Sequence, residues 1–278
     1  MARHPLCPEE NAISYSKYWY WKQPPLNPLS QELLEFPVKV EQALPFERLN
    51  DLLTPGYLPR EHGWCMLPDG GGYASSYIWM PDVTVEMLDW WYIWHFVKPQ
   101  GVPEGCGNLR YKIWCPQEHV DTGFLDEDSR LKALDESLPL RERRYGQKNF
   151  ILESMDGGEG DNLLDLRAAC HDPVEFGFDA HMVAMPESGT IIAAESSGNL
   201  NIYQFRPYGL GGRGVEMRVR IYAGYDLVDG KAVRNDIPVT PEMLIGNIKH
   251  VLVEYPNLAR FLPSLYAEEG CKPITGTY

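Results

Sequence analysis

The segment NIKHVLVEYPN, residues 247–257, carries a histidine and a glutamate at a spacing that could bind one small object. His250 and Glu254 are four positions apart, and on an α-helix such side chains have Cβ atoms about 5–6 Å apart. They could share a metal ion, share a proton, or bind only each other. Because the neighbouring residues are mostly apolar, an uncompensated carboxylate would be costly here. The spacing alone therefore leaves both an ion pair and a metal site open.

A metal ion would need further ligands, and the chain offers several. His119 follows the segment RYKIWCPQE, and Glu153 lies inside the segment FILES, where a carboxylate is out of place in a strand unless it faces a polar cavity. His95 ends an aromatic run, and His181 opens the segment HMVAMP. Each of these residues taken singly is also what a hydrogen-bonded or surface position would carry. Residue type does not decide between these roles.

The elements that must position these side chains predict an α+β fold. Short runs rich in aromatic and β-branched residues, separated by brief turns, indicate consecutive strands of an antiparallel sheet. A helix is expected over residues 82–96, with Asp82 or Thr84 as its cap. Residues 117–144 are polar and are expected to form a long surface excursion. The expected strands are residues 72–80, 109–116, 148–155, 179–187, 189–197, 199–207 and 215–225.

The C-terminal part of the chain predicts one long helix. Thr240 is a good N-cap, Pro241 suits the first helical position, and Glu242 favours the positive end of the helix dipole. Pro256 predicts that the helix ends near Tyr255. A run of antiparallel strands followed by such a helix indicates a sheet that curls around it.

The first part of the chain has a different character. Residues 1–58 are rich in proline and contain two short helical patterns, SQELLEF and PFERLNDLL. So few periodic apolar residues cannot close a core alone. We therefore expect residues 1–58 to form an N-terminal helical arm with a role in dimerisation, and residues 59–278 to form the metal-binding catalytic domain.

Composition excludes some classes of partner. The 278 residues carry a formal net charge of −14, which repels nucleic-acid phosphates and anionic lipid headgroups. No run approaches the roughly 18–20 apolar residues of a membrane span, and the amino terminus has no apolar signal region. The six cysteines form no CxxC pair, so reduced thiols are expected. These features predict a soluble cytoplasmic protein.

Four motifs in order resemble a known family. The segments PDVTVEMLDWWYIWHF, RYKIWCPQEH, NFILES and IKHVLVEYPN together resemble the phloretin hydrolase and 2,4-diacetylphloroglucinol hydrolase family, from about Gly63 to Pro263. The resemblance implies a helix-grip fold of the Bet v 1 or START type and a zinc ion. It assigns the metal ligands to His119, Glu153, His250 and Glu254. A mixed nitrogen and oxygen ligand set would also accept iron or manganese.

The resemblance also implies an activity and further site residues. The family cleaves the carbon–carbon bond between an aromatic ring and an acyl carbonyl, which releases a phloroglucinol and a carboxylic acid. Tyr111, expected on the same strand as His119, resembles a tyrosine that contacts substrate, and Tyr208 is a looser match to a second. Apart from the resemblance, His181 is a candidate proton donor because of the strand expected around it, and a four-ligand count would allow Glu153 to leave the metal and act as base. A family amide near the first histidine has no counterpart in residues 120–122, so substrate preference is not implied.

Two other functions are consistent with the same residues. A helix-grip protein could hold an aromatic or lipid-like ligand without chemistry, and stoichiometric metal would count against that function. An iron-dependent oxygenase of phenolic compounds could use a similar ligand set. Oxygen uptake would distinguish it from a hydrolase. An acylated polyphenol substrate and a homodimer are the partners that follow from the resemblance.

Overall fold

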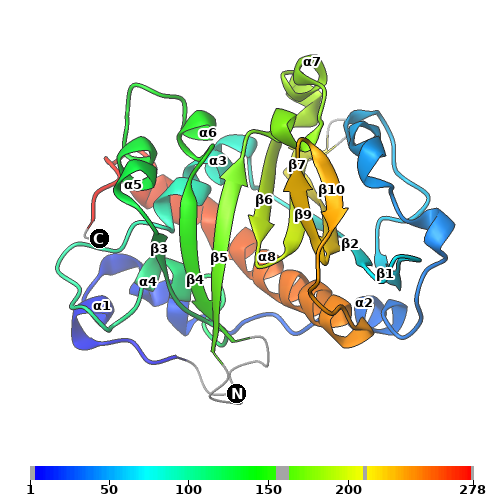
Figure 1. The fold of residues 1–278 in the computed structure, drawn as a ribbon. Helices are drawn as coiled ribbons and strands as arrows, with labels where there is room; N and C mark the ends of the chain where they lie inside the picture. Colours follow the sequence, from blue (N-terminus) through cyan, green and yellow to red (C-terminus); the bar gives the residue numbers. More distant parts are fainter. Residues whose placement is uncertain (1–3, 155–162, 209–211, 277–278) are drawn as a thin grey trace. The chain divides into compact units, whose positions relative to one another are not determined.

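The computed structural model describes residues 4–154, 163–208 and 212–276, and the chain divides into two compact units. The first unit comprises residues 1–24, 86–169 and 253–278, and the second comprises residues 25–85 and 170–252. Each unit combines helices with antiparallel strands (Figure 1). The predicted α+β class is therefore confirmed, with an antiparallel sheet and a long C-terminal helix.

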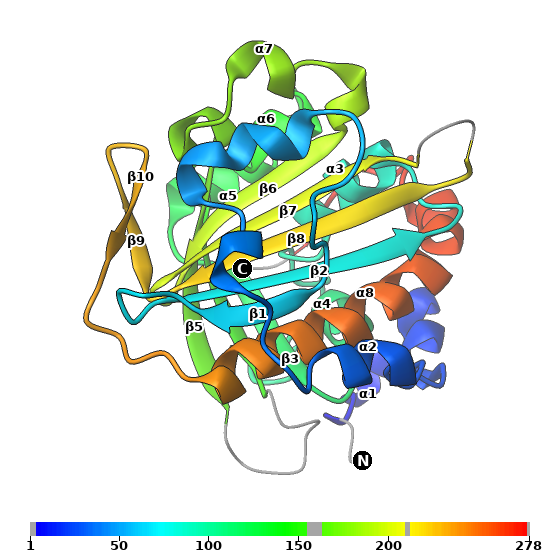
Figure 2. The ribbon, with the colours of Figure 1, turned by 90° about the vertical axis from the view of Figure 1, so that its right-hand side faces the viewer.

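The second unit contains an antiparallel run of strands that matches most of the predicted ones. Its strands lie side by side, and each neighbouring pair is antiparallel (Figure 2). A hairpin follows them in the chain. The order across the sheet is β1 (Gly63–Met66), β2 (Gly72–Met80), β8 (Val215–Ala223), β7 (Asn199–Pro207) and β6 (Thr190–Ser196), and the hairpin is β9 (Tyr225–Val228) and β10 (Lys231–Arg234).

Strand β8 is buried along its whole length, on both of its faces. Alternation places Arg218 and Arg220 on the face opposite its apolar residues, and both guanidinium groups are fully covered. Glu61 forms ion pairs with both, at 2.7 Å to Arg218 and 2.5 Å to Arg220. The carbonyl of Leu52 also accepts a hydrogen bond from Arg218. A buried charge is tolerated only with such partners.

Residues 25–58 contribute to the core of the second unit. The 3₁₀ segment η3 (Phe46–Leu53) places Phe46, Leu49 and Leu52 in the same apolar cluster as Tyr222 of β8. The Tyr222 hydroxyl donates a hydrogen bond to the carbonyl of Leu44 at 2.7 Å. These contacts place residues 44–52 against the sheet of the second unit. The expected boundary near residue 58 and the role in dimerisation stay predictions.

The first unit pairs three strands and packs them with short helices. Strand β4 (Lys148–Glu153) lies between β3 (His119–Phe124) and β5 (Leu164–His171), and both pairs are antiparallel. The prediction of a strand over residues 148–155 is confirmed, whereas β3 was expected to be part of a surface excursion. The other helices in or around this unit are α1 (Pro8–Asn11), α3 (Val85–Trp94), α4 (Leu109–Lys112), α5 (Glu127–Ala133) and α6 (Leu140–Arg143).

The predictions of strands over residues 109–116 and 179–187 are wrong. Each of these segments starts with a helix, because a side-chain N-cap stands at its beginning. Residues 109–116 form helix α4 and a turn, since the Asn108 side chain accepts a hydrogen bond from the Arg110 amide. Residues 179–187 contain helix α7 (Ala180–Val183), where the Asp179 side chain accepts from the Met182 amide. Asparagine and aspartate are strong N-cap residues. The caps outweigh the strand propensity of the residues that follow.

Helix α8 (Pro241–Glu269) begins as predicted and ends much later than predicted. The Thr240 hydroxyl accepts a hydrogen bond from the Met243 amide at 3.4 Å, which confirms the cap. The helix continues through Pro256 and Pro263, although each proline removes one backbone hydrogen bond. The face beyond Pro256 carries fully buried apolar side chains, and their burial offsets that cost. Among the residues that the structure describes, no helix combines the length and apolar character that a membrane span requires.

Candidate metal centre

The sheet of the first unit brings a histidine and a glutamate together from two strands. His119 begins β3, Glu153 ends β4, and the two residues are direct partners across the antiparallel pair. The His119 Nε2 atom lies 3.6 Å from a carboxylate oxygen of Glu153. Both residues are buried, with exposed fractions of 0% and 6%. A charged group at this depth needs a compensating partner.

Helix α8 supplies a second carboxylate to the same imidazole. Glu254 is buried, and its oxygen lies 3.4 Å from His119 Nε2. One turn beyond it, Asn257 donates a hydrogen bond to the carbonyl of Trp114 at 2.9 Å. This contact anchors the helix to the turn that precedes β3. The register of α8 therefore aims Glu254 at the imidazole.

His250 stands four residues before Glu254 on the same helix. Both residues belong to the continuous helix α8, so His250 lies about one helical turn from Glu254 on the same side of the helix. Ligand atoms of His119, His250 and Glu254 all lie within 4.8 Å of one another. The structure thus contains a group of two histidines and one glutamate that could hold a metal ion.

The hydrogen bond made by His119 determines which ring nitrogen faces the carboxylates. Its Nδ1 lies 3.2 Å from the carbonyl oxygen of Tyr111. A carbonyl only accepts hydrogen bonds, so Nδ1 carries the hydrogen, and Nε2 of the neutral ring presents a lone pair to Glu153 and Glu254. Three acceptor groups then converge in a buried space. A proton shared among them, or a metal ion between them, would offset their repulsion.

Tyr111 supports this cluster in two ways. Its ring stacks on the His119 imidazole, with centroids 3.8 Å apart and planes 7° apart. Its hydroxyl donates a hydrogen bond to Glu153. Burial, followed by the charge of Glu153, raises the pKa of Tyr111 well above its usual value of 10.0. The phenol therefore stays neutral and remains a donor to the carboxylate.

The route by which Tyr111 reaches His119 differs from the predicted one. Tyr111 was expected on the strand that leads to His119, but it lies on helix α4, and the chain turns before β3 begins. The His119 amide donates to the carbonyl of Cys115 at 2.8 Å, which closes this turn. The reversal places residue 111 over residue 119. An extended strand would have separated them by more than 20 Å.

Trp114 is a further member of the site that the sequence did not single out. Its ring meets the His119 imidazole edge-on at 5.2 Å, and it meets the Tyr255 ring in the same way. Tyr255 directly follows Glu254. The aromatic wall therefore restricts both the imidazole and the helix that carries the second carboxylate. The clustering of aromatic residues near His119 in the sequence is the signal that could have indicated it.

The donor set fits a divalent metal ion. Zinc binds imidazole nitrogen and carboxylate oxygen at about 2.0–2.2 Å, so neighbouring ligand atoms in a tetrahedral site lie about 3.4 Å apart. The separations of 3.4 Å and 3.6 Å around His119 Nε2 agree with that spacing. Iron and manganese accept the same nitrogen and oxygen ligands. The chemistry of the donor set therefore supports a metal site without identifying the metal.

The remaining predicted site residues lie in the second unit. His181 is exposed on α7, and Tyr208 follows β7, where its ring packs against Trp79 at 5.6 Å. Their roles as proton donor and substrate contact stay predictions.

Several curated proteins are similar to this chain over nearly its whole length. Phloretin hydrolase of Eubacterium ramulus is 29% identical over 270 residues, which cover 94% of this chain and 92% of that protein. The 2,4-diacetylphloroglucinol hydrolases of Pseudomonas sp and Pseudomonas protegens are each 25% identical over 277 residues, with 92% of this chain covered. The alignments cover 88% and 84% of those two proteins.

One solved structure and one family model are also similar to this chain. A Staphylococcus aureus protein of unknown function aligns with 72% of this chain and 98% of its own, at a TM-score of 0.35 and 8% identity, which is too distant to inform the fold. The model of the DAPG hydrolase PhiG domain matches residues 44–267. This match spans most of the chain and agrees with the relatives. The chain therefore belongs to the DAPG hydrolase family and is a hydrolase, as its motifs predicted.

Proposed function

We propose that this enzyme hydrolyses the carbon–carbon bond between a polyhydroxylated aromatic ring and its acyl carbonyl. The products are a phloroglucinol-type phenol and a carboxylic acid, from substrates of the phloretin or acetylphloroglucinol class. The observation that carries the proposal is the buried cluster of His119, Glu153 and Glu254 with Tyr111. Its presence in a chain of the DAPG hydrolase family makes hydrolysis the natural use of such a site.

The reaction needs a proton on the ring carbon and a water molecule on the carbonyl. Protonation at the acyl-bearing carbon converts the phenol to a cyclohexadienone. Addition of water to the carbonyl carbon is followed by cleavage of the bond to the ring, and the electron pair of that bond returns to the ring as an enolate. Water is consumed, its hydroxyl stays with the acyl group, and the enolate returns to the phenol. The enzyme must therefore supply one base and one acid.

Glu153 is the proposed base, and Tyr111 is the residue that positions it. The Tyr111 hydroxyl holds one Glu153 oxygen, while the Glu153 carboxylate lies beside the imidazole of His119. The resemblance also assigns Glu153 as a metal ligand, and it would serve as base when it is not coordinated. His181 as proton donor and Tyr208 as substrate contact complete the proposed set.

His119, His250 and Glu254, with Glu153 beside them, would hold the metal. A bound zinc ion, or iron or manganese in its place, supplies a Lewis acid that polarises a substrate oxygen or lowers the pKa of water. Aromatic rings take the place of water beside His119. The charge of a bound metal ion would therefore be screened less than in water. Zinc is the metal that we propose on the basis of the family resemblance.

We also propose the helix-grip arrangement that the resemblance implies, with a cytoplasmic homodimer as the working form. Support comes from the antiparallel strand order and from a contact inside the second unit. The Leu244 side chain of α8 lies so close to Gly72 of β2 that an added Cβ there would come within 2.7 Å of it. This close approach supports the start of α8 packing on the sheet.

The proposal is tested by anaerobic incubation of the purified chain with phloretin. We expect release of phloroglucinol and the phenylpropionic acid in equal amounts, measured by chromatography. Prior chelation should abolish release, and addition of zinc, ferrous iron or manganese should show which metal restores it. Cleavage that requires oxygen would indicate an oxygenase, and binding of phloretin without any product would indicate a binding protein.

A matched pair of variants tests the metal ligands. His250→Ala should lower the metal content and abolish turnover, because it removes one ligand of the triad. Lys249→Ala alters an exposed neighbour on the same helix and should retain both. Unchanged metal content and turnover in His250→Ala would refute the assignment.

A further inference from the structure

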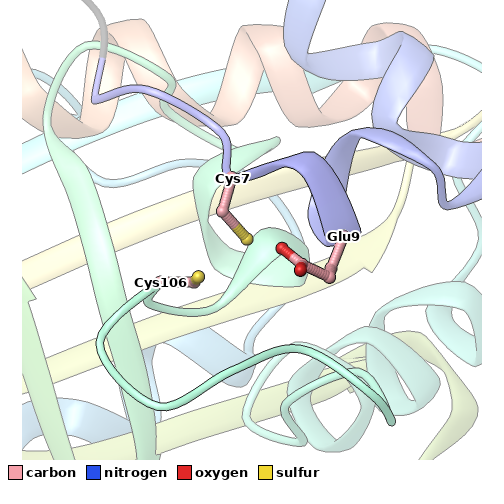
Figure 3. Close-up of side chains that lie close together, drawn as sticks. All are labelled: Cys7, Glu9 and Cys106. Carbon is pink, nitrogen blue, oxygen red and sulfur yellow. The ribbon is translucent and has the colours of Figure 1, made fainter.

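A second group of metal-ligand type lies in the first unit, apart from the histidine and glutamate triad. The sulfur atoms of Cys7 and Cys106 and a carboxylate oxygen of Glu9 all lie within 4.8 Å of one another (Figure 3). Cys7 precedes helix α1, Glu9 lies in its first turn, and Cys106 lies in the loop ahead of α4. The two cysteines are partly buried, and Glu9 is exposed. The family resemblance assigns no role to these residues.

A buried ion pair holds the two cysteine-bearing segments together. The Lys112 side chain is 2% exposed, and its ammonium group lies 2.9 Å from the Glu10 carboxylate. It also donates hydrogen bonds to the carbonyl of Pro5 and to the carbonyl of Cys106. Lys112 thus links the segment that contains Cys7 to the loop that contains Cys106. The positions of the sulfur atoms are therefore set before any ligand binds.

The backbone around each cysteine restricts it further. The Cys7 amide donates a hydrogen bond to Glu10 at 3.0 Å. Cys106 lies between two glycines with left-handed φ values, 89° at Gly105 and 82° at Gly107. A Cβ on Gly107 would come within 2.3 Å of the Val120 carbonyl, so this loop is packed closely against β3. Such preorganisation favours ligand binding, because the ordering cost has already been met.

The chemistry of the three donors points to a soft or borderline cation. The sulfur atoms of Cys7 and Cys106 and the Glu9 carboxylate oxygen lie within 4.8 Å of one another, close enough to bind one ion. Thiolates with a carboxylate are typical ligands of zinc and cadmium. The Lys112 charge is already paired with Glu10, and the net charge of −14 attracts cations to the surface.

We propose that Cys7, Glu9 and Cys106 form a second metal site, which binds a zinc-like cation through two thiolates and one carboxylate. The cation displaces the thiol protons and leaves a fourth position for water. It connects residues 4–24 to the loop that leads into α4, the helix that carries Tyr111. The site is structural in kind, and it does not depend on the proposed activity.

Cadmium is the probe that tests this site, because cadmium–thiolate bonds have an ultraviolet absorption band that nitrogen and oxygen ligands do not produce. Cadmium is titrated into the reduced full-length chain. We expect the band to saturate at one equivalent of thiolate-bound metal in the wild type and in Cys271→Ser, which alters an exposed cysteine. The double variant Cys7→Ser/Cys106→Ser should lose the band, and Glu9→Gln should keep it with weaker binding.

A second measurement applies if the double variant does not fold. Alkylation of the wild-type cysteines, followed by peptide mass spectrometry, should show that zinc protects Cys7 and Cys106 and leaves Cys271 reactive. Absence of the band in the wild type, its persistence in the double variant, or equal alkylation with and without zinc would overturn the proposal. Recovery of a Cys7–Cys106 disulfide that excludes cadmium under reducing conditions would overturn it as well.

Discussion

At the scale of single residues, the orientation of one imidazole organises the candidate metal centre. The Tyr111 carbonyl takes the Nδ1 hydrogen of His119, and this leaves Nε2 directed at two buried carboxylates. A second hydrogen bond from the same residue, made by its hydroxyl, holds Glu153. Groups that hydrogen-bond to metal ligands in this way set the orientation and the basicity of those ligands. Tyr111 therefore acts on the histidine and on the glutamate together.

Removal of the Tyr111 hydroxyl tests this role. Tyr111→Phe keeps the ring stacked on His119 but loses the donor to Glu153, so we expect turnover to fall by about 10–100-fold, the usual effect of losing a group that supports a ligand. The value of kcat should fall more than KM changes. Steady-state kinetics with phloretin measures the effect.

Tyr92→Phe is the matched control for that substitution. Tyr92 belongs to the same aromatic cluster, and its hydroxyl contacts the hydroxyl of Tyr255. It should retain most of the turnover. Equal losses in the two variants would show that the effect comes from the packing of the cluster, and not from the hydrogen bond to Glu153.

At the scale of elements, strand β8 shows how a polar face can be buried. Its alternation was predicted, but a strand with arginines on one face is usually half exposed. Here the segment before β1 covers that face with the Glu61 carboxylate. Burial acts to raise the pKa of Glu61, but hydrogen bonds and charges from Arg218 and Arg220 outweigh it, and the pKa is lowered below 4.5. Glu61 is thus charged in the folded chain.

Substitution of Glu61 should therefore destabilise the fold in a pH-dependent way. Glu61→Gln leaves two buried arginines without their carboxylate, and removal of one partner from a buried ion pair costs about 3–5 kcal/mol. A carboxylate whose pKa is lower when folded adds stability above its unfolded pKa and loses it as the pH falls through the folded value. The difference from wild type should be largest at neutral pH and shrink below about pH 4.

Urea unfolding at neutral and at acidic pH measures this difference. Glu35→Gln changes an exposed carboxylate in the same unit and should match the wild type within about 0.5 kcal/mol at neutral pH. A Glu61→Gln variant as stable as the wild type at neutral pH would mean that the ion pairs on β8 contribute no net stability.

At the scale of the whole molecule, the proposed metal couples segments that are far apart in the sequence. Its ligands come from β3, β4 and α8, at positions 119, 153, 250 and 254. A ligand that binds only the folded chain stabilises it by about 4 kcal/mol at a thousandfold excess over its Kd. Metal binding and global stability should therefore be linked.

Chelation tests this link through thermal unfolding. Removal of the metal should lower the Tm of the wild type, by roughly 2–4 °C for each kcal/mol that is lost. The shift should be smaller in Glu254→Gln, which has already lost one ligand of the triad. Equal shifts in the two proteins would place the stabilising metal elsewhere, and no shift in the wild type would favour a proton shared among His119 and the carboxylates.

The sequence by itself determined the features that depend on neighbours within about one helical turn. The spacing of His250 and Glu254 places both on one side of α8, and Thr240 begins that helix with its side-chain cap. The strands β2, β4, β6, β7 and β8 follow from their local composition. Local backbone preferences and side-chain caps act over only a few residues, and these residues are visible in the sequence.

Only the tertiary structure decided which distant residues meet. The register of β3 against β4 pairs His119 with Glu153, and the turn after α4 stacks Tyr111 on His119. Helix α8 continues past Pro256, because buried apolar side chains on its far half outweigh the lost hydrogen bonds. Strand register, turn geometry and long-range burial depend on free energies summed over residues far apart in the chain. Local pattern cannot specify these sums, so the site became visible only in the folded molecule.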